Sequence, residues 1–244
     1  MSKSSQFHYN TDVDLPQVLD ILDQQGYPHP LAELTAGNAF RTLVGCIISL
    51  RTKDEVTLPA CQRLFALADS PQALLDLSLA QVETLIYPAG FYKTKALTLQ
   101  NACQKILSDF SGQVPQSIEA LLTFKGVGRK TANLVVGLGH GLPAICVDIH
   151  VHRICNRLGV VTSEDPEATE WALRTHLPVA YWEKINWLMV LHGQRICRPI
   201  GAWCDVCAVA NLCQQVAVKK RKPPEPSSKK QAPEIKRHHF DYLR

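Results

Sequence analysis

The sequence has no long apolar run. Its most nearly continuous one, Leu43–Leu50, is far shorter than the roughly 20 residues that a membrane-spanning helix needs. The composition is not that of a disordered chain either, because 46% of the 244 residues are hydrophobic and only 20% are charged. The first six residues are polar and no apolar signal core follows them, so we expect neither secretion nor membrane insertion.

The chain has no net positive charge outside its C-terminal segment. Residues 217–244 carry nine Lys or Arg and three Asp or Glu, a net charge of +6, which leaves −2 for residues 1–216 out of the formal +4. The pI of about 8.6 therefore gives no evidence that the body binds nucleic acid. Proline, serine and lysine in 217–244 predict a flexible basic tail, either a solubilising extension or a salt-sensitive arm on DNA phosphates.

Alternating patterns typical of β-strands are few, and apolar residues recur at helical spacing instead. The expected helices cover residues 14–22, 38–50, 74–85, 94–107, 118–124, 133–138, 149–158 and 182–192. We therefore expect an all-α fold.

A glycine turn joins two of these expected helices. Gly126 and Gly128 let the chain turn tightly, and Val127 between them can fill the space between the helices. The next helix would direct its free N–H groups and its positive dipole end at a DNA phosphate. The Arg129-Lys130 pair that follows strengthens the prediction of a DNA-binding hairpin.

Two residues near this turn are candidates for chemistry. Lys130 is either a solvated surface lysine or an amine nucleophile, whose pKa we expect the positive helix end to lower. Asp148 is placed to cap the helix over 149–158, and its second oxygen is free to face a substrate. His150 and His152 do not share a helix face, so we expect no metal there.

Cysteines cluster near the end of the body. Four of the nine, Cys197, Cys204, Cys207 and Cys213, lie within seventeen residues and predict a metal site. Iron–sulfur ligation tolerates their mixed spacing, while zinc, which usually has two close pairs, stays an alternative. The other five occur in apolar helical contexts and are expected in the core: Cys46, Cys61, Cys103, Cys146 and Cys155.

The hairpin, the segment Val147–His150, the triplet Leu191–Gly193 and the four-cysteine pattern together resemble the endonuclease III family. These are helix-hairpin-helix DNA glycosylases with an iron–sulfur cluster. The resemblance covers roughly residues 15–215 and implies two helical domains with a DNA-binding cleft between them.

The same resemblance implies domain boundaries. Residues 32–142 would form a six-helix domain that contains the hairpin. Residues 1–31 and 143–216 would form the iron–sulfur cluster domain, and 217–244 would remain the flexible basic tail.

The resemblance also implies a reaction. A damaged base would be flipped into the cleft. Lys130 would attack the anomeric carbon and expel the base, with Asp148 stabilising positive charge on the sugar and assisting deprotonation of the lysine. The Schiff base would then allow β-elimination, which makes the protein a bifunctional glycosylase and AP lyase. The cluster would be a structural [4Fe-4S] cluster that fixes the loop between Cys197 and Cys204 against DNA.

Two positions depart from the family pattern. Arg51 stands where the family usually has glutamine, the residue inserted into the gap left by the flipped base. Phe91 matches the wedge on the other side of that gap, where it either intercalates or simply packs within the protein. The cluster loop has Arg198 as its single basic residue. The expected DNA-binding residues are Gly126, Val127, Gly128, Arg129, Arg51, Phe91 and Arg198.

The leading hypothesis is excision of oxidised pyrimidines from double-stranded DNA that carries damaged bases or abasic sites, by a monomer with no membrane partner. The alternatives are a pyrimidine-dimer glycosylase of the same fold and a non-catalytic DNA-binding module with structural zinc. The expected location is the bacterial cytoplasm, at the nucleoid. The run Lys219–Lys222 can also be read as a nuclear signal.

Overall fold

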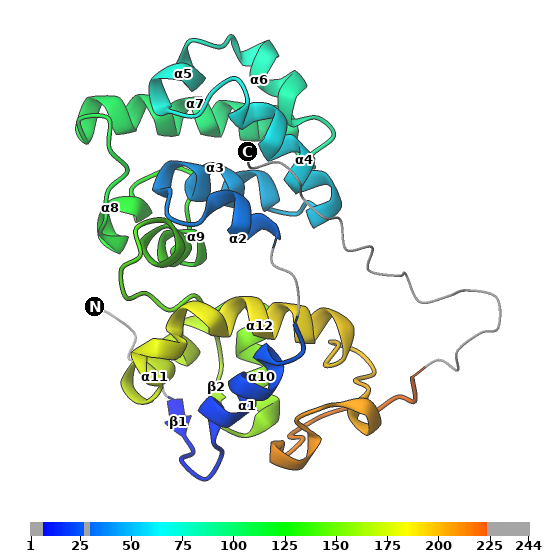
Figure 1. Ribbon diagram of the computed structural model, residues 1–244. Coiled ribbons are helices and arrows are strands. Elements are labelled where there is room, and N and C mark those ends of the chain that lie inside the picture. The colour runs from blue at the N-terminus through cyan, green and yellow to red at the C-terminus, as the bar shows by residue number, and fades with distance from the viewer. Residues whose placement is uncertain (1–6, 27–29, 224–244) are drawn as a thin grey trace, which may run out of the picture.

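The structure is a computed structural model that describes residues 7–26 and 30–223, and it is built mostly from helices. The predicted all-α fold is confirmed, apart from two short strands. The chain forms two lobes stacked one on the other (Figure 1). No helix in the described ranges is long and apolar enough to cross a bilayer.

Each lobe has its own set of buried apolar side chains. One set runs from Phe40 to Ala144. The other joins Val13–Leu22 to residues between Ile145 and Val209. We call residues 30–144 the hairpin lobe, and residues 7–26 with 145–223 the cysteine lobe.

The hairpin lobe is entirely helical, and its most buried helix is α3, where eight residues are buried. The capping residue Asn38 starts this helix, since its side chain accepts a hydrogen bond from the Arg41 backbone N–H. The helices are α2 (Pro30–Thr35), α3 (Ala39–Ser49), α4 (Asp54–Phe65), α5 (Pro71–Leu75), α6 (Leu79–Ile86), α7 (Tyr92–Asp109), α8 (Ile118–Leu122), α9 (Arg129–Leu134) and the π-helical turn η1 (Val135–Gly139).

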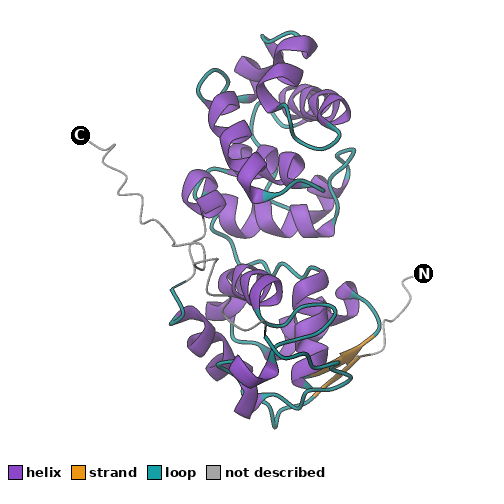
Figure 2. Ribbon diagram, turned by 90° about the vertical axis from the view of Figure 1, so that its right-hand side faces the viewer, coloured by secondary structure: helices purple, strands orange, loops and turns teal. Residues whose placement is uncertain are grey.

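The cysteine lobe contains the N-terminal helix and everything after the hairpin. Its two strands pair antiparallel, with Phe7 opposite Ser163 and Tyr9 opposite Val161, at one end of the lobe (Figure 2). The elements are β1 (Phe7–Tyr9), α1 (Leu15–Asp23), α10 (Ile149–Leu158), β2 (Val161–Ser163), α11 (Pro166–His176), η2 (Val179–Tyr181), α12 (Trp182–Arg195), η3 (Cys204–Val206) and η4 (Ala210–Leu212).

Several helix predictions need correction. The single helix expected over 74–85 is two helices, because Ser78 and Gln81 form a capping box that starts α6 afresh. The second hairpin helix begins at Arg129 rather than at residue 133. In the first hairpin helix, α8, Leu121 is buried, whereas Leu122 is 42% exposed. The strands escaped prediction because three residues are too few to show alternation.

The predicted boundary of the tail is also wrong in part. The Ala202 N–H donates to Lys219 O (3.1 Å), and the Arg221 N–H donates to Ala202 O (3.0 Å). These bonds form a parallel bridge between Ala202 and Lys220. Residues 219–221 are therefore held against the cysteine lobe, and residues 224–244 lie outside the described part of the chain.

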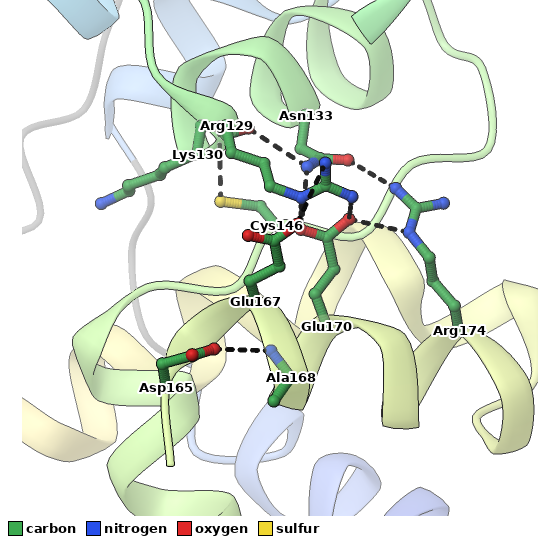
Figure 3. A network of polar contacts seen from close by, with 9 residues as sticks. All are labelled: Arg129, Lys130, Asn133, Cys146, Asp165, Glu167, Ala168, Glu170 and Arg174. Atoms are coloured by element: carbon green, nitrogen blue, oxygen red, sulfur yellow. Dashed lines mark hydrogen bonds and ion pairs between the residues drawn. The ribbon is translucent and has the colours of Figure 1, made fainter. Parts of the chain in front are cut away.

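A buried ion-pair network joins the two lobes (Figure 3). Glu170 of α11 accepts hydrogen bonds from Arg129 of α9 through Nε (2.7 Å) and Nη2 (2.9 Å). Arg174 Nε also donates to Glu170 (2.8 Å), and its Nη2 donates to Asn133 Oδ1 (2.8 Å). The Glu170 side chain is 3% exposed, so its charge depends on these partners for stabilisation.

Replacing the buried carboxylate should therefore destabilise the protein. We expect Glu170→Gln to lower the free energy of unfolding by about 3 kcal/mol, because two arginines lose their counter-charge. Urea unfolding followed by circular dichroism measures this. The matched control is Glu164→Gln, an exposed position, which we expect to change stability by no more than about 0.5 kcal/mol. Equal stability of the two variants would contradict the network's role.

Candidate active site between the lobes

A cavity of about 700 Å³ opens between the lobes. Six helices from the two lobes contribute to it, so it exists only when both lobes are in place. Its lining includes Ser49, Asp54, Arg129, Lys130, Val147, Asp148, Ile149, His150, Asp165, Glu167, Glu170, Val190 and Gln194. The two residues predicted to carry the chemistry, Lys130 and Asp148, both lie in this lining.

Asp148 uses its two carboxylate oxygens differently. Oδ1 caps α10 by accepting from the backbone N–H groups of His150 (2.8 Å) and Val151 (3.1 Å). Oδ2 accepts a hydrogen bond from Lys130 Nζ (3.1 Å). The cap holds the carboxylate in one orientation, with its side chain only 7% exposed, so the second oxygen stays aimed at the lysine. The capping prediction is confirmed.

Lys130 lies in the first turn of α9, as predicted, and its side chain extends away from the Arg129 guanidinium (Figure 3). Burial by itself lowers the pKa of Lys130, but attraction to Asp148 outweighs it, and the pKa lies above the ordinary lysine value of 10.5. The expectation of a lowered pKa is therefore wrong for the free protein. The neighbouring carboxylate stabilises the ammonium against the effect of burial.

The two histidines after Asp148 have other partners. His150 Nδ1 lies 3.1 Å from Arg153 Nη2, and His152 Nδ1 lies 2.7 Å from Thr169 Oγ1. The two side chains contact different partners and do not share a helix face, as their spacing predicts.

The hairpin turn is built as the sequence predicts. Gly126 has φ +83°, in the left-handed region, and a side chain there would press on Thr98. Val127 is 6% exposed and belongs to the core of the hairpin lobe. Gly128 is the N-cap residue of α9. The Arg129 guanidinium is bound to Glu170, so its observed contact joins the lobes, and its predicted DNA contact stays a prediction.

Arg51 and Phe91 lie close together although forty residues separate them in the sequence. The Arg51 guanidinium carbon is 5.7 Å from the centre of the Phe91 ring. Both residues have left-handed backbones, with φ +52° and +58°. Such strain in non-glycine residues concentrates at functional sites. Arg51 lies between Ser49 and Asp54, which line the cavity.

Two buried charged residues, Glu170 and Lys95, were not predicted from the sequence. Glu170 and Lys95 are buried charged side chains, 2% and 5% exposed, on the inward faces of α11 and α7. Lys95, Leu99, Ala102 and Ile106 follow one helical stripe. A charge on an apolar stripe was the available signal, since such a charge needs a specific partner.

The four clustered cysteines line one small apolar cavity in the cysteine lobe. Arg157 Nη1 donates to Cys197 Sγ (3.4 Å), and the Gln215 N–H donates to Cys213 Sγ (3.3 Å). Donors aimed at sulfur suit ligands that carry thiolate charge. Within residues 7–26 and 30–223, no three Cys, His, Asp or Glu side chains converge as a single metal ion requires.

The structure also places the other five cysteines and the cluster loop. All five cysteines expected in the core are buried. Trp203 lines the cysteine cavity, and the Arg198 guanidinium carbon lies 4.3 Å from its ring centre. Arg198 is exposed at the surface of the loop.

Comparison with known proteins identifies the class. A family model described as the HhH-GPD superfamily of base excision DNA repair proteins matches residues 44–178. Endonuclease III of Thermotoga maritima is 42% identical over 175 residues, which cover 72% of this chain and 82% of that protein.

Solved structures agree with the sequence comparison. A non-covalent endonuclease III–DNA complex matches with a TM-score of 0.74 at 28% identity, covering 84% of this chain and 96% of that one. A trapped endonuclease III–DNA covalent intermediate matches with a TM-score of 0.71 at 30% identity, covering 82% and 95%. The chain belongs to the endonuclease III family, whose members are DNA glycosylases and AP lyases of base excision repair.

The contact between Asp148 and Lys130 yields a direct test. We expect Asp148→Asn to lower the pKa of Lys130, because the negative charge that raises it is lost while asparagine can still cap α10. Titration of ¹³C-labelled lysine by NMR measures this pKa. Asp165→Asn is the control, since Asp165 also caps a helix in the cavity lining but binds the Ala168 N–H. A Lys130 pKa that moves equally in both variants would contradict the assignment.

Proposed function

We propose that the protein removes oxidised pyrimidines from double-stranded DNA and cleaves the resulting abasic site by β-elimination. The observation that carries this proposal is the Lys130 amine, 3.1 Å from the Asp148 carboxylate in an open cavity between the lobes. A base turned out of the duplex would enter this cavity. Lys130 and Asp148 come from the same chain, so the proposed chemistry needs no residue from a second copy.

The proposed chemistry divides between the two residues. Lys130 gives up a proton with the help of Asp148, and its Nζ attacks the anomeric carbon of the sugar. The glycosidic bond breaks, and its electron pair leaves with the base. Asp148 stabilises the positive charge that develops on the sugar, because its carboxylate is fixed by the cap on α10.

The second half of the reaction follows from the bond to Lys130. The amine and the opened sugar form a protonated Schiff base, which acidifies the neighbouring C2′ proton. Loss of that proton forms a C=C bond and expels the 3′ phosphate, so the strand breaks on the 3′ side. Hydrolysis of the Schiff base regenerates the Lys130 amine.

Borohydride trapping tests the role of Lys130. With a duplex that carries thymine glycol or an abasic site, the wild-type protein should give a covalent complex on reduction, and Lys130→Ala should give none. Lys105→Ala, a surface lysine of α7 paired with Asp109, is the control and should trap as the wild type does. Trapping by Lys130→Ala would exclude this lysine as the nucleophile.

Parallel substrates separate the alternatives. A duplex with a cyclobutane pyrimidine dimer tests the related glycosylase activity. DNA binding without trapping on any substrate would favour a non-catalytic module.

We also propose that Cys197, Cys204, Cys207 and Cys213 hold a [4Fe-4S] cluster. Four sulfurs on the wall of one cavity, with only Cys204 and Cys207 as a close pair in the sequence, suit an iron–sulfur cluster better than one zinc ion. When bound, the cluster would cross-link the segment that carries Arg198, a structural rather than catalytic contribution.

Metal analysis tests the cluster. Purified protein should be yellow-brown and contain about four iron atoms per chain. Cys204→Ala should lose iron, whereas Cys103→Ala, in the core of the hairpin lobe, should keep it. Colourless protein with one zinc ion per chain would contradict the proposal.

We further propose that Arg51 and Phe91 occupy the space that the flipped nucleotide leaves. Both are exposed, Arg51 lies between the lining residues Ser49 and Asp54 in the sequence, and an aromatic ring with a guanidinium can stack between bases. The backbone amides of the Gly126–Gly128 turn and the Arg198 loop would contact phosphates.

A further inference from the structure

Lys95 is a buried lysine that the proposed chemistry does not use. It lies in the first turn of α7 and is 5% exposed. No ion pair with a carboxylate is found for it among the described residues. Burial lowers its pKa to about 8. A cation in so unfavourable a position indicates a specific role.

All three hydrogens of the Lys95 ammonium have acceptors. Nζ donates to Ile48 O (2.6 Å), Leu50 O (2.6 Å) and Thr52 Oγ1 (2.7 Å). Ile48 and Leu50 lie at the C-terminal end of α3, where carbonyl groups lack helical partners and the helix dipole favours a cation. Lys95 therefore caps the C-terminal end of α3, although it lies on α7, more than forty residues later in the sequence.

These acceptors flank Arg51 on both sides. Leu50 precedes it and Thr52 follows it, so the Lys95 ammonium forms hydrogen bonds with both sequence neighbours of this left-handed residue. Without such support an arginine would relax from φ +52° toward the common region of backbone angles.

The same cluster fixes the opposite loop. The Gly90 N–H donates to Thr52 Oγ1 (3.1 Å), the oxygen that Lys95 also binds. Gly90 approaches so closely that a Cβ would lie 2.9 Å from Arg51 O. Phe91 follows directly, and the Lys95 N–H donates to Phe91 O (3.0 Å). The Lys95 ammonium thus binds the Leu50–Thr52 segment directly and is linked to the Gly90 loop through Thr52 Oγ1.

We propose that Lys95 is a positioning residue that holds Arg51 and Phe91 in the geometry needed to replace a flipped nucleotide. This inference rests on the proposed function, because it assigns Arg51 and Phe91 to the gap. It predicts a defect confined to substrates in which a base must leave a duplex.

The test compares duplex and single-stranded substrates. We expect Lys95→Met, which keeps the bulk of the side chain without its donors, to slow excision of thymine glycol from a duplex by about tenfold or more. Borohydride trapping on a single-stranded oligonucleotide with an abasic site should stay within about twofold of wild type, because no stacked base has to be replaced. Lys93→Met removes an exposed cation from the same turn and should preserve both activities.

A double-mutant cycle shows whether Lys95 acts through Arg51. We expect Lys95→Met to reduce the duplex rate less in an Arg51→Ala background than in the wild type, since one of the two residues that the lysine positions is then absent. Additive losses, or equal losses on duplex and single-stranded DNA, would overturn the inference. Full duplex activity of folded Lys95→Met would overturn it as well.

Two further measurements keep the test decisive. If Lys95→Met does not fold by circular dichroism, Thr52→Val removes the shared acceptor without altering any charge and should show the same duplex-specific loss. If the wild-type protein traps neither substrate, the proposed function fails rather than the role of Lys95.

Discussion

The ion pair between Glu170 and Arg129 is the contact on which the site depends, because the two residues proposed for catalysis lie in different lobes. Lys130 is carried by α9 of the hairpin lobe, and Asp148 by the start of α10 in the cysteine lobe. Arg129, directly before Lys130, is held by Glu170 through two hydrogen bonds. Fixing α9 against α11 in this way sets the 3.1 Å approach of Lys130 to Asp148.

Asp148 shows how a structural and a chemical role share one side chain. Its capping oxygen satisfies two backbone donors of α10, which gives the carboxylate a fixed orientation. Its other oxygen favours the ammonium form of Lys130, so in the free protein the proposed nucleophile carries a proton. Positive charge on an attacked sugar would compete with the ammonium for the same carboxylate. Substrate binding would then weaken the hold on that proton.

The sequence predicted the local parts of this arrangement and missed the long-range ones. The hairpin turn and the cap at Asp148 depend on neighbouring residues, so spacing and residue type were enough. The pKa of Lys130 was predicted in the wrong direction because the carboxylate that raises it against the effect of burial is eighteen residues away. Glu170 and Lys95 were missed because their partners come from other helices. In both helices the sequence shows a charged residue on a buried stripe, but it does not show which groups that charge binds.

The charge distribution can now be assigned to places in the fold. The body was expected to be slightly acidic and the basic charge to lie in a free tail. The backbone bridge between Ala202 and Lys220 instead places the start of the basic run, Lys219–Arg221, against the cluster loop between Cys197 and Cys204. That loop has only one basic residue of its own, Arg198. Lys219, Lys220 and Arg221 therefore add positive charge where the loop is deficient in it, and they do so at fixed backbone positions. An ordered cation attracts phosphate with less loss of entropy than one on a flexible chain.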